Sequence, residues 1–350
     1  MSSEPNLTRR RSLRNTADLI EAGLVAPEGR IALDQVAART AIALTPAIVD
    51  LIQSGDDPIA RQFVPSAAEL HTAPEERTDP IGDEAYSPVK GIVHRYPDRV
   101  LLKPIMVCPV YCRFCFRREA VGDADGTLTA AEMDAALAYV AGRPELREII
   151  VTGGDPFMLP PARLAALVAR VANIPHVEVL RFHTRIPVAD PERVTDALAD
   201  ALKTESELAV WVSVHANHAR ELSPAARLAL RRLADAGLPL VSQTVLLRGV
   251  NDSADALEDL FRALVRNRVR PYYLHHPDLA RGTAHFRLSI AEGQAIMRAL
   301  RGRLTGIAQP TYVLDIPGGA GKVPLMPAWW DQERGEVEDW QGGKHRYPPG

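Results

Sequence analysis

The chain has 350 residues, of which 46% are hydrophobic and 24% are charged, and its formal net charge at pH 7 is −3. This length allows one large hydrophobic core. Its apolar runs fall short of the roughly 18–20 residues that a membrane helix needs, and the mild acidity gives no electrostatic reason to expect nucleic acid as a main partner. We therefore expect a globular protein that neither spans a membrane nor binds nucleic acid.

Residues 1–90 predict an N-terminal helical extension. Two stretches have a helical pattern, ALDQVAARTAIAL (32–44) and TPAIVDLIQ (45–53). Connectors rich in Pro and Asp separate such pieces, for example GDDP (55–58) and APEERTDPIGDEAYSP (73–88). These residues break helices and favour turns, so the predicted helices are short.

From residue 99 onward, short apolar runs alternate with segments of helical period. Six runs predict strands: VLLKPIMV (100–107), EIIVTGG (148–154), VEVLRFHT (177–184), LAVWVSVH (208–215), LPLVSQTVLL (238–247) and VRPYYLHH (269–276). Six segments predict helices, with ranges 129–142, 161–172, 190–203, 223–237, 252–267 and 289–303. Strict alternation predicts a parallel sheet with right-handed crossovers, and the apolar strands indicate that both of its faces are buried.

Polar residues cluster where the predicted strands end, which favours a barrel over an open doubly wound sheet. They are Cys108 to Cys115, Gly153 to Asp155, His183, Arg185, His215, Gln243 and Asp278. Barrel enzymes carry their active sites at this end of the strands. Six units predict an α/β fold with a partial (β/α)6 TIM-like barrel over residues 91–305. TYVLDIP (311–317) predicts a seventh strand, and the polar tail after residue 330 is expected to wrap the surface.

All three cysteines, Cys108, Cys112 and Cys115, lie in CPVYCRFCFRR. Odd, clustered cysteines are a poor disulfide framework, so we expect a reducing cytoplasm. A Cys3His zinc site and inert buried thiols are alternative interpretations. The pattern favours a cubane iron–sulfur cluster: such clusters normally take four thiolates, so three would leave one iron open to a substrate or cofactor.

The C-x3-C-x2-C spacing, with Phe114 as the aromatic residue before the last cysteine, resembles the radical S-adenosylmethionine (SAM) superfamily. Longer motifs are similar to its lysine 2,3-aminomutase family: HRYPDRVLL, CFRR, VTGGDP, QTVLLRGVND, RPYYLHHPDL, AHFR and DIPGGAGK. The similarity covers residues 80–328. It implies the same partial barrel, a [4Fe-4S] cluster on the three cysteines, SAM on the open iron, and an external electron donor such as a flavodoxin or ferredoxin.

The resemblance also implies pyridoxal 5′-phosphate as a cofactor. Lys322 in GGAGKVP matches the catalytic lysine that bonds it, while Arg95, Tyr96 and Arg99 match residues that bind it. Arginine forks suit phosphate oxygens. A P-loop is the competing interpretation of GGAGK, but its first glycine and its Ser/Thr after the lysine are both missing. Residues 306–350 are therefore expected to form a C-terminal cofactor-binding segment.

The resemblance further assigns SAM and substrate contacts. Residues that match SAM-binding positions are Phe114, Gly153, Gly154, Asp155, His215 and Gln243. Arg117 matches the arginine that binds the substrate carboxylate, and Asp278 and Asp315 match the aspartates that bind a distal ammonium. A buried charge needs an opposite charge, and two carboxylates would reject an acidic side chain. L-lysine is the expected substrate, converted to β-lysine by 2,3-migration of its amino group.

Several alternatives stay open. The compact length and CFRR resemble relatives that supply β-lysine for elongation factor P, whereas DIPGGAGK resembles the catabolic enzymes, and the two groups form opposite enantiomers. The substrate could instead be a related amino acid such as ornithine or arginine. A non-catalytic iron–sulfur or zinc module for electron transfer or protein binding is the other class. No cysteines are left for the family's zinc site between subunits, so the sequence allows a homo-oligomer but does not predict its order.

Overall fold

The computed structural model describes residues 11–122 and 126–349, and its centre is one nine-stranded sheet whose strands lie in chain order. The strands are β1 (Ile92–Tyr96), β2 (Arg99–Ile105), β3 (Glu148–Gly153), β4 (Val179–Thr184), β5 (Ala209–His215), β6 (Leu240–Val245), β7 (Val269–His275), β8 (Thr311–Ile316) and β9 (Gly321–Pro324). From β2 to β8 the neighbours are parallel, while β1 and β9 add antiparallel edges. The predicted strands and their parallel order are confirmed.

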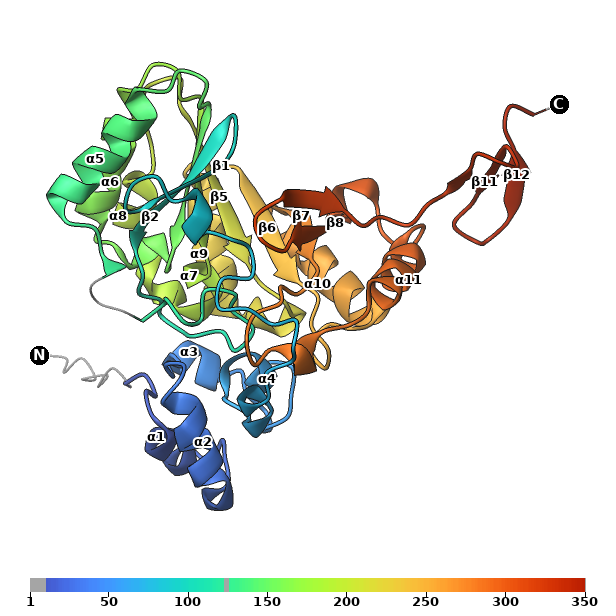
Figure 1. The fold of residues 1–350 in the computed structure, drawn as a ribbon, viewed down its shortest axis with the longest axis horizontal. Helices are drawn as coiled ribbons and strands as arrows, with labels where there is room; N and C mark the ends of the chain where they lie inside the picture. The colour runs from blue at the N-terminus through green and yellow to red at the C-terminus, as the bar shows by residue number, and fades with distance from the viewer. Residues whose placement is uncertain (1–10, 123–125, 350) are drawn as a thin grey trace, which may run out of the picture.

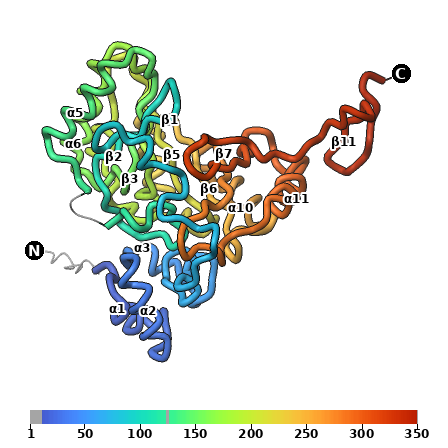
Figure 2. Tube along the Cα trace, viewed as in Figure 1, coloured from blue at the N-terminus to red at the C-terminus, as the bar shows by residue number. Residues whose placement is uncertain are grey.

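Helices follow the parallel strands and cover the outside of the curved sheet (Figure 1, Figure 2). They are α5 (Ala130–Ala141), α6 (Pro161–Ala172), α7 (Ile186–Ala189), α8 (Asp196–Asp200), α9 (Pro224–Asp235), α10 (Ala254–Arg266) and α11 (Ile290–Leu300). Several begin directly after a Thr or Ser whose side chain accepts a backbone N–H, as Thr129 does for α5 and Ser253 for α10. Such caps satisfy N–H groups that have no partner inside the helix.

Alternation along each strand separates an outer apolar layer from a polar interior. In β4, Leu180 and Phe182 are fully buried in the outer core, where the Phe182 ring centroid lies 5.9 Å from that of Phe157. Their neighbours Arg181 and His183 instead line an interior cavity of about 730 Å³. Successive strand side chains point to opposite faces, so one strand supplies both layers. The sheet curls around this cavity as a partial TIM-like barrel, as the sequence predicted.

The sheet departs from the predicted elements in two places. HRYPDR does not precede the first strand: Arg95 lies in β1 and Arg99 begins β2, so the motif is the turn of an antiparallel hairpin. The helix predicted over 190–203 is reduced to a 3-10 turn at Pro191–Arg193 and the five residues of α8. Pro191 and the capping residue Thr195 interrupt it, because each favours a helix start over a helix interior.

The N-terminal segment forms short helices that lie beside the barrel (Figure 1). They are α1 (Thr16–Glu21), α2 (Arg30–Ala37), α3 (Pro46–Val49) and α4 (Ala60–Phe63). The helix expected over 32–44 already ends at Ala37. Leu19, Ile48 and Phe63 form a separate apolar cluster that includes Val110 of the cysteine loop. No helix in the described ranges is long and apolar enough to cross a membrane.

The C-terminal tail, which was predicted to wrap the surface, contacts it only in part: a Cβ on Gly302 would lie 2.5 Å from the Trp340 ring. It forms its own antiparallel sheet from β10 (Trp330–Asp331), β11 (Glu336–Glu338) and β12 (Lys344–Arg346), which Figure 1 shows extending away from the barrel. One ion pair joins it to α11, between Arg298 Nη1 and Glu338 Oε1 at 2.8 Å. The main sheet continues through β8 and β9, past residue 305, and the predicted division of the chain into three parts stays a prediction.

Candidate active site

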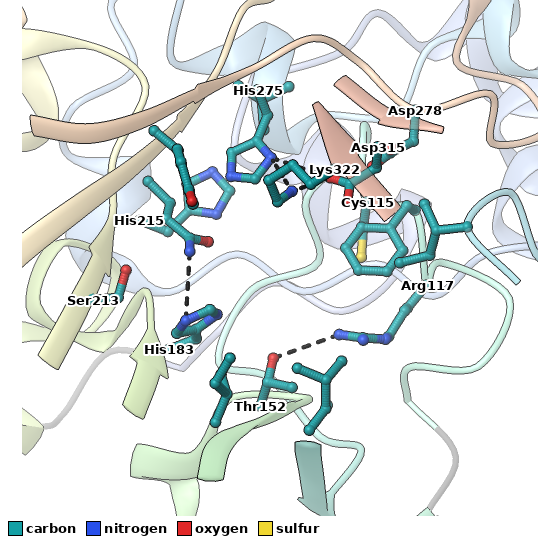
Figure 3. Close-up of a pocket in the computed structure, with 18 of the residues that line it drawn as sticks. Cys115, Arg117, Thr152, His183, Ser213, His215, His275, Asp278, Asp315 and Lys322 are labelled. Carbon is teal, nitrogen blue, oxygen red and sulfur yellow. Dashed lines mark hydrogen bonds and ion pairs between the residues drawn. The ribbon is translucent and has the colours of Figure 1, made fainter. Parts of the chain in front are cut away.

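The barrel cavity brings together all of the residues that the sequence singled out as a site. Figure 3 labels six of them: Cys115, Arg117, His215, Asp278, Asp315 and Lys322. The site residues come from the ends of most strands and from the connecting loops: Cys108, Cys112, Phe114, Cys115, Arg117, Gly153, Gly154, Asp155, His215, Gln243, Asp278, Asp315, Lys322, Arg95, Tyr96 and Arg99 all line the cavity. Their common location agrees with a single site at the barrel interior. The role of each residue stays a prediction.

The three thiols lie in a loop after β2 and are not joined by disulfides. Burial raises the pKa of Cys115 to about 11, so its thiolate needs an added positive charge. Cys112 has such a partner, because Arg185 Nη1 lies 2.8 Å from its Sγ. Among the described residues, no three His, Cys, Asp or Glu side chains are close enough to hold one metal ion.

A buried ion network fixes the cysteine loop to the N-terminal segment. Arg113, only 1% exposed, donates from Nε and Nη2 to the carboxylate of Glu69 at 2.6–3.1 Å, and Arg118 donates to the same carboxylate. Arg113 also donates to the carbonyl of Ala41 at 2.9 Å. Of the three arginines in RFCFRR, Arg117 is therefore the one whose side chain faces the cavity.

The glycine pair after β3 permits a close approach of two backbones. A Cβ on Gly154 would lie 2.5 Å from both N and O of Val107, directly before the cysteine loop, and Gly153 adopts φ +109°. The next residue, Asp155, is buried and accepts from Thr184 Oγ1 at 2.7 Å and from the Arg185 N–H at 2.6 Å. Its carboxylate therefore joins the ends of β3 and β4, a structural role that the sequence interpretation had not included.

Lys322 and Asp315 form an ion pair across the antiparallel β8–β9 pair. His275 completes the group, with Nδ1 3.5 Å from Asp315 Oδ2 and 3.4 Å from Lys322 Nζ. The Lys322 backbone N–H donates to the Tyr96 hydroxyl at 2.7 Å, which draws the two edge strands together. Although burial opposes it, hydrogen bonding from His275 and the Lys322 charge hold the pKa of Asp315 below its usual range.

Asp278, the other predicted ammonium-binding aspartate, is in a different state. It lies in the loop after β7, and its Oδ1 has no hydrogen-bond partner among the described residues. Burial, helped by the nearby charge of Asp315, raises the pKa of Asp278 to about 7. A buried carboxylate oxygen without a hydrogen-bond partner is costly, so Oδ1 of this group is available to an incoming cation.

Two of the predicted anion-binding arginines share a counter-ion that the sequence interpretation missed. Asp83 accepts from Arg117 Nε at 2.8 Å and from Arg95 Nη2 at 3.2 Å. Arg99 behaves differently, because its guanidinium stacks 3.8 Å from the Tyr96 ring centroid and pairs with Asp98 at 2.6 Å. Asp83 lies in a connector rich in Pro and Asp, which has no periodic pattern that would have marked it.

Comparison with known proteins decides the family. A family model described as Radical SAM superfamily matches residues 102–262, and one described as Lysine-2,3-aminomutase matches residues 297–335. The chain is 41% identical over 290 residues to an L-lysine 2,3-aminomutase of Fusobacterium nucleatum, with 82% of this chain and 68% of the relative covered. This chain belongs to the lysine 2,3-aminomutase family of radical SAM enzymes.

Other relatives of this chain act on more than one amino acid, as their names state. An L-lysine 2,3-aminomutase of Escherichia coli is 40% identical, with 79% of this chain and 81% of the relative covered. A glutamate 2,3-aminomutase of Clostridioides difficile is 36% identical, with 82% and 68% covered. Family membership makes the chain an enzyme, an isomerase that uses a [4Fe-4S] cluster and SAM on a small-molecule substrate.

The interior of this aminomutase-family barrel also holds three half-buried histidines, His183, His215 and His275 (Figure 3). Burial lowers the pKa of each, and nearby cations lower it further, so all three are neutral at pH 7. His215 packs 5.7 Å from the Phe114 ring and lies 3.2 Å from Asn217 Oδ1, while Gln243 contacts His183 at 3.4 Å. His275 is the last residue of β7 and lies in the motif RPYYLHHPDL, so its position at a strand end could have marked it as a site residue.

Proposed function

We propose that this enzyme is a lysine 2,3-aminomutase that uses pyridoxal phosphate and converts L-lysine to β-lysine. The observation that carries the proposal is the shared cavity, in which two half-buried aspartates lie with Lys322 and the three cysteines. The cysteines are the only strong thiolate donors, Lys322 is a cavity amine, and Asp278 and Asp315 supply opposite charge for a second, distal ammonium.

Charge favours lysine over glutamate as the substrate. An acidic side chain would meet Asp278 and Asp315, both half-buried, and like charges at short distance are costly in a weakly screened interior. Asp315 is paired with Lys322, whereas Oδ1 of Asp278 has no hydrogen-bond partner among the described residues and can accept a cation. A lysine side chain would therefore bind Asp278 directly and share Asp315 with Lys322. Ornithine and arginine carry the same charge and stay as narrower alternatives.

The donor set fits the proposed cofactors. Cys108, Cys112 and Cys115 would hold the cluster, with Arg185 next to one sulfur as a charge partner. Phe114, Gly153, Gly154, Asp155, His215 and Gln243 would surround SAM. When bound, the cluster and SAM supply a carbon radical, and pyridoxal phosphate holds the migrating nitrogen.

Lys322 would hold the pyridoxal group, since its amine lies inside the cavity, and Tyr96 would fix the lysine backbone through the bond described above. Arg95 and Arg99 would bind the phosphate, and Arg117 the substrate carboxylate. The chemistry also calls for an external electron donor such as a flavodoxin or ferredoxin, and oxygen-sensitive thiolates suit a reducing cytoplasm. A homo-oligomer is compatible with this proposal.

The test is an anaerobic product assay. The protein is reconstituted with iron, sulfide and pyridoxal phosphate, then given reductant, SAM and isotopically labelled L-lysine, and the products are resolved on a chiral column. Lys322→Ala is expected to abolish β-lysine and the absorbance of bound pyridoxal. The matched control is Lys203→Ala, because Lys203 lies on the surface and pairs with Asp200.

Labelled β-lysine from the wild-type protein supports the proposal, and its enantiomer separates a catabolic role from supply to elongation factor P. Preferential turnover of ornithine or arginine would show that the substrate is that amino acid and not lysine. An intact cluster with no bound pyridoxal and no turnover of any amino acid would instead favour a non-catalytic iron–sulfur module and contradict the proposal.

A further inference from the structure

Residues 79–86, near the end of the N-terminal segment, pack against the glycine-rich loop that joins β8 to β9, the strand that carries Lys322. The Gly318 N–H donates to the Pro80 carbonyl at 3.2 Å. A Cβ on Gly82 would lie 2.7 Å from the Gly318 backbone, and one on Gly319 would lie 2.4 Å from the Tyr86 ring. The two segments therefore meet backbone to backbone, and a shift of residues 79–86 would move the glycine-rich loop.

Asp83 is the central side chain of this segment. It is 7% exposed and does not line the cavity. Arg95 and Arg117, which it contacts, do line the cavity. Its two oxygens are divided between them: Oδ1 accepts from Arg95 at 3.2 Å and Oδ2 accepts from Arg117 at 2.8 Å. One carboxylate thus sets the separation and direction of two guanidinium groups.

The positive charges around Asp83 favour anions at the cavity face. Lys103 Nζ also lies 3.9 Å from Asp83 Oδ2, so three cations surround one carboxylate. Burial would raise the pKa of Asp83, but the three cations hold it below its usual range, and the group is ionised at neutral pH. Asp79 and Glu84 add negative charge near Lys103, whereas Arg95 and Arg117 share the single carboxylate of Asp83, and anionic ligand groups at the cavity face would balance the two guanidinium groups.

We propose that Asp83 is a positioning residue that aligns Arg95 and Arg117, so that a phosphate and a substrate carboxylate bind side by side in the cavity. This inference rests on the proposed function, in which Arg95 serves the cofactor phosphate and Arg117 the lysine carboxylate. Asp83 touches neither ligand and acts through the arginines. Because one residue serves both, its loss weakens the binding of cofactor and substrate together.

The experiment compares Asp83→Asn, Asp83→Glu and Glu84→Gln in the reconstituted enzyme. Glu84 is the matched control, because it adjoins Asp83 in the same segment, is exposed, and loses the same charge in Glu84→Gln. For each variant we would measure iron content, the pyridoxal phosphate concentration for half-saturation, and KM and kcat for L-lysine. Asp83→Asn is expected to raise KM and the half-saturating concentration each by about tenfold, with iron content unchanged, since it weakens charge-assisted hydrogen bonds.

Rescue by Asp83→Glu, which keeps the carboxylate, and wild-type values for Glu84→Gln would support the proposal. Asp83→Asn with both constants within about twofold of the wild-type values would overturn it. Loss of iron together with lysine affinity would also overturn it, because that outcome assigns Asp83 to the fold. The wild-type enzyme separates this test from that of the function: if it forms no β-lysine, the proposed function fails before Asp83 is examined.

Discussion

At the scale of single residues, one residue type occurs in opposite electrostatic states within one cavity. Asp315 is paired with Lys322 and His275, and its pKa is lowered. Asp278 is half-buried, its Oδ1 is buried without a hydrogen-bond partner among the described residues, and its pKa is raised to about 7. Burial penalises the charged form of both carboxyls, so the presence of a partner decides the direction. Both aspartates were predicted from motifs, but their different states follow from their neighbours.

The raised pKa of Asp278 predicts a pH dependence of lysine binding. Above about pH 7 the carboxyl is ionised and attracts the substrate ammonium; below it the carboxyl is protonated and the attraction is lost. The KM for L-lysine is therefore expected to rise as the pH decreases from 8 to 6. Asp278→Asn should remove this dependence and raise KM at pH 8 by about tenfold or more. KM measured across this range checks it, with exposed Asp200→Asn as control; a pH-independent wild-type KM would contradict it.

At the scale of secondary-structure elements, the contacts between strand ends decide where the cysteine loop lies. β2 ends directly before the cysteine loop, and β3 ends at a glycine pair that lets the two backbones touch. Asp155 then joins β3 to the end of β4. These contacts place the start of the cysteine loop relative to the cavity. Larger side chains at these glycines would separate the strand ends.

Gly154→Ala tests this contact. The added Cβ would lie 2.5 Å from backbone atoms of Val107, which cannot rotate away, so the cysteine loop must shift. We expect a loss of stability of about 1–3 kcal/mol and a lower iron content after reconstitution. Thermal unfolding and iron analysis measure both. Gly306→Ala is the control, since nothing lies within 4 Å of its Cβ position. Wild-type iron content and Tm in Gly154→Ala would show that the contact is not needed.

At the scale of the whole molecule, the N-terminal segment supports the site from outside the barrel. Glu69 binds Arg113 and Arg118 of the cysteine loop. Residues 79–86 contact Arg95, Arg117 and the glycine-rich loop between β8 and β9. The apolar cluster around Phe63 adds packing against Val110 of the same loop. The barrel alone therefore does not contain all of the groups that shape its active site.

Glu69→Gln is expected to destabilise the protein by about 3–5 kcal/mol, because it leaves two buried guanidinium groups without a counter-charge. Cluster iron should fall as well, since Arg113 lies between two of the cysteines. Chemical denaturation and iron analysis measure the effects. The matched control is Glu178→Gln, whose exposed pair with Arg147 should contribute no more than about 1 kcal/mol. Equal denaturation midpoints for the two variants would refute the support assigned to Glu69.

The sequence by itself determined the parallel barrel, the cysteine loop and the residues that meet in the cavity. Apolar runs such as 148–154 and amphipathic segments such as 161–172 carry their periodicity locally, and parallel strands bring their ends to one side. Short elements were less predictable: the helix expected over 190–203 contains a proline and an internal cap, and HRYPDR was not recognised as a hairpin turn.

Only the tertiary structure decided how the polar groups are paired. Asp83 joins two arginines that follow it by 12 and 34 residues, Glu69 reaches Arg113 across 44, and His275 reaches Asp315 from the neighbouring strand. Such pairs leave no local pattern in the sequence. Their charges, and the pKa of Asp278 that depends on them, follow from burial and distance, which exist only once the chain has folded.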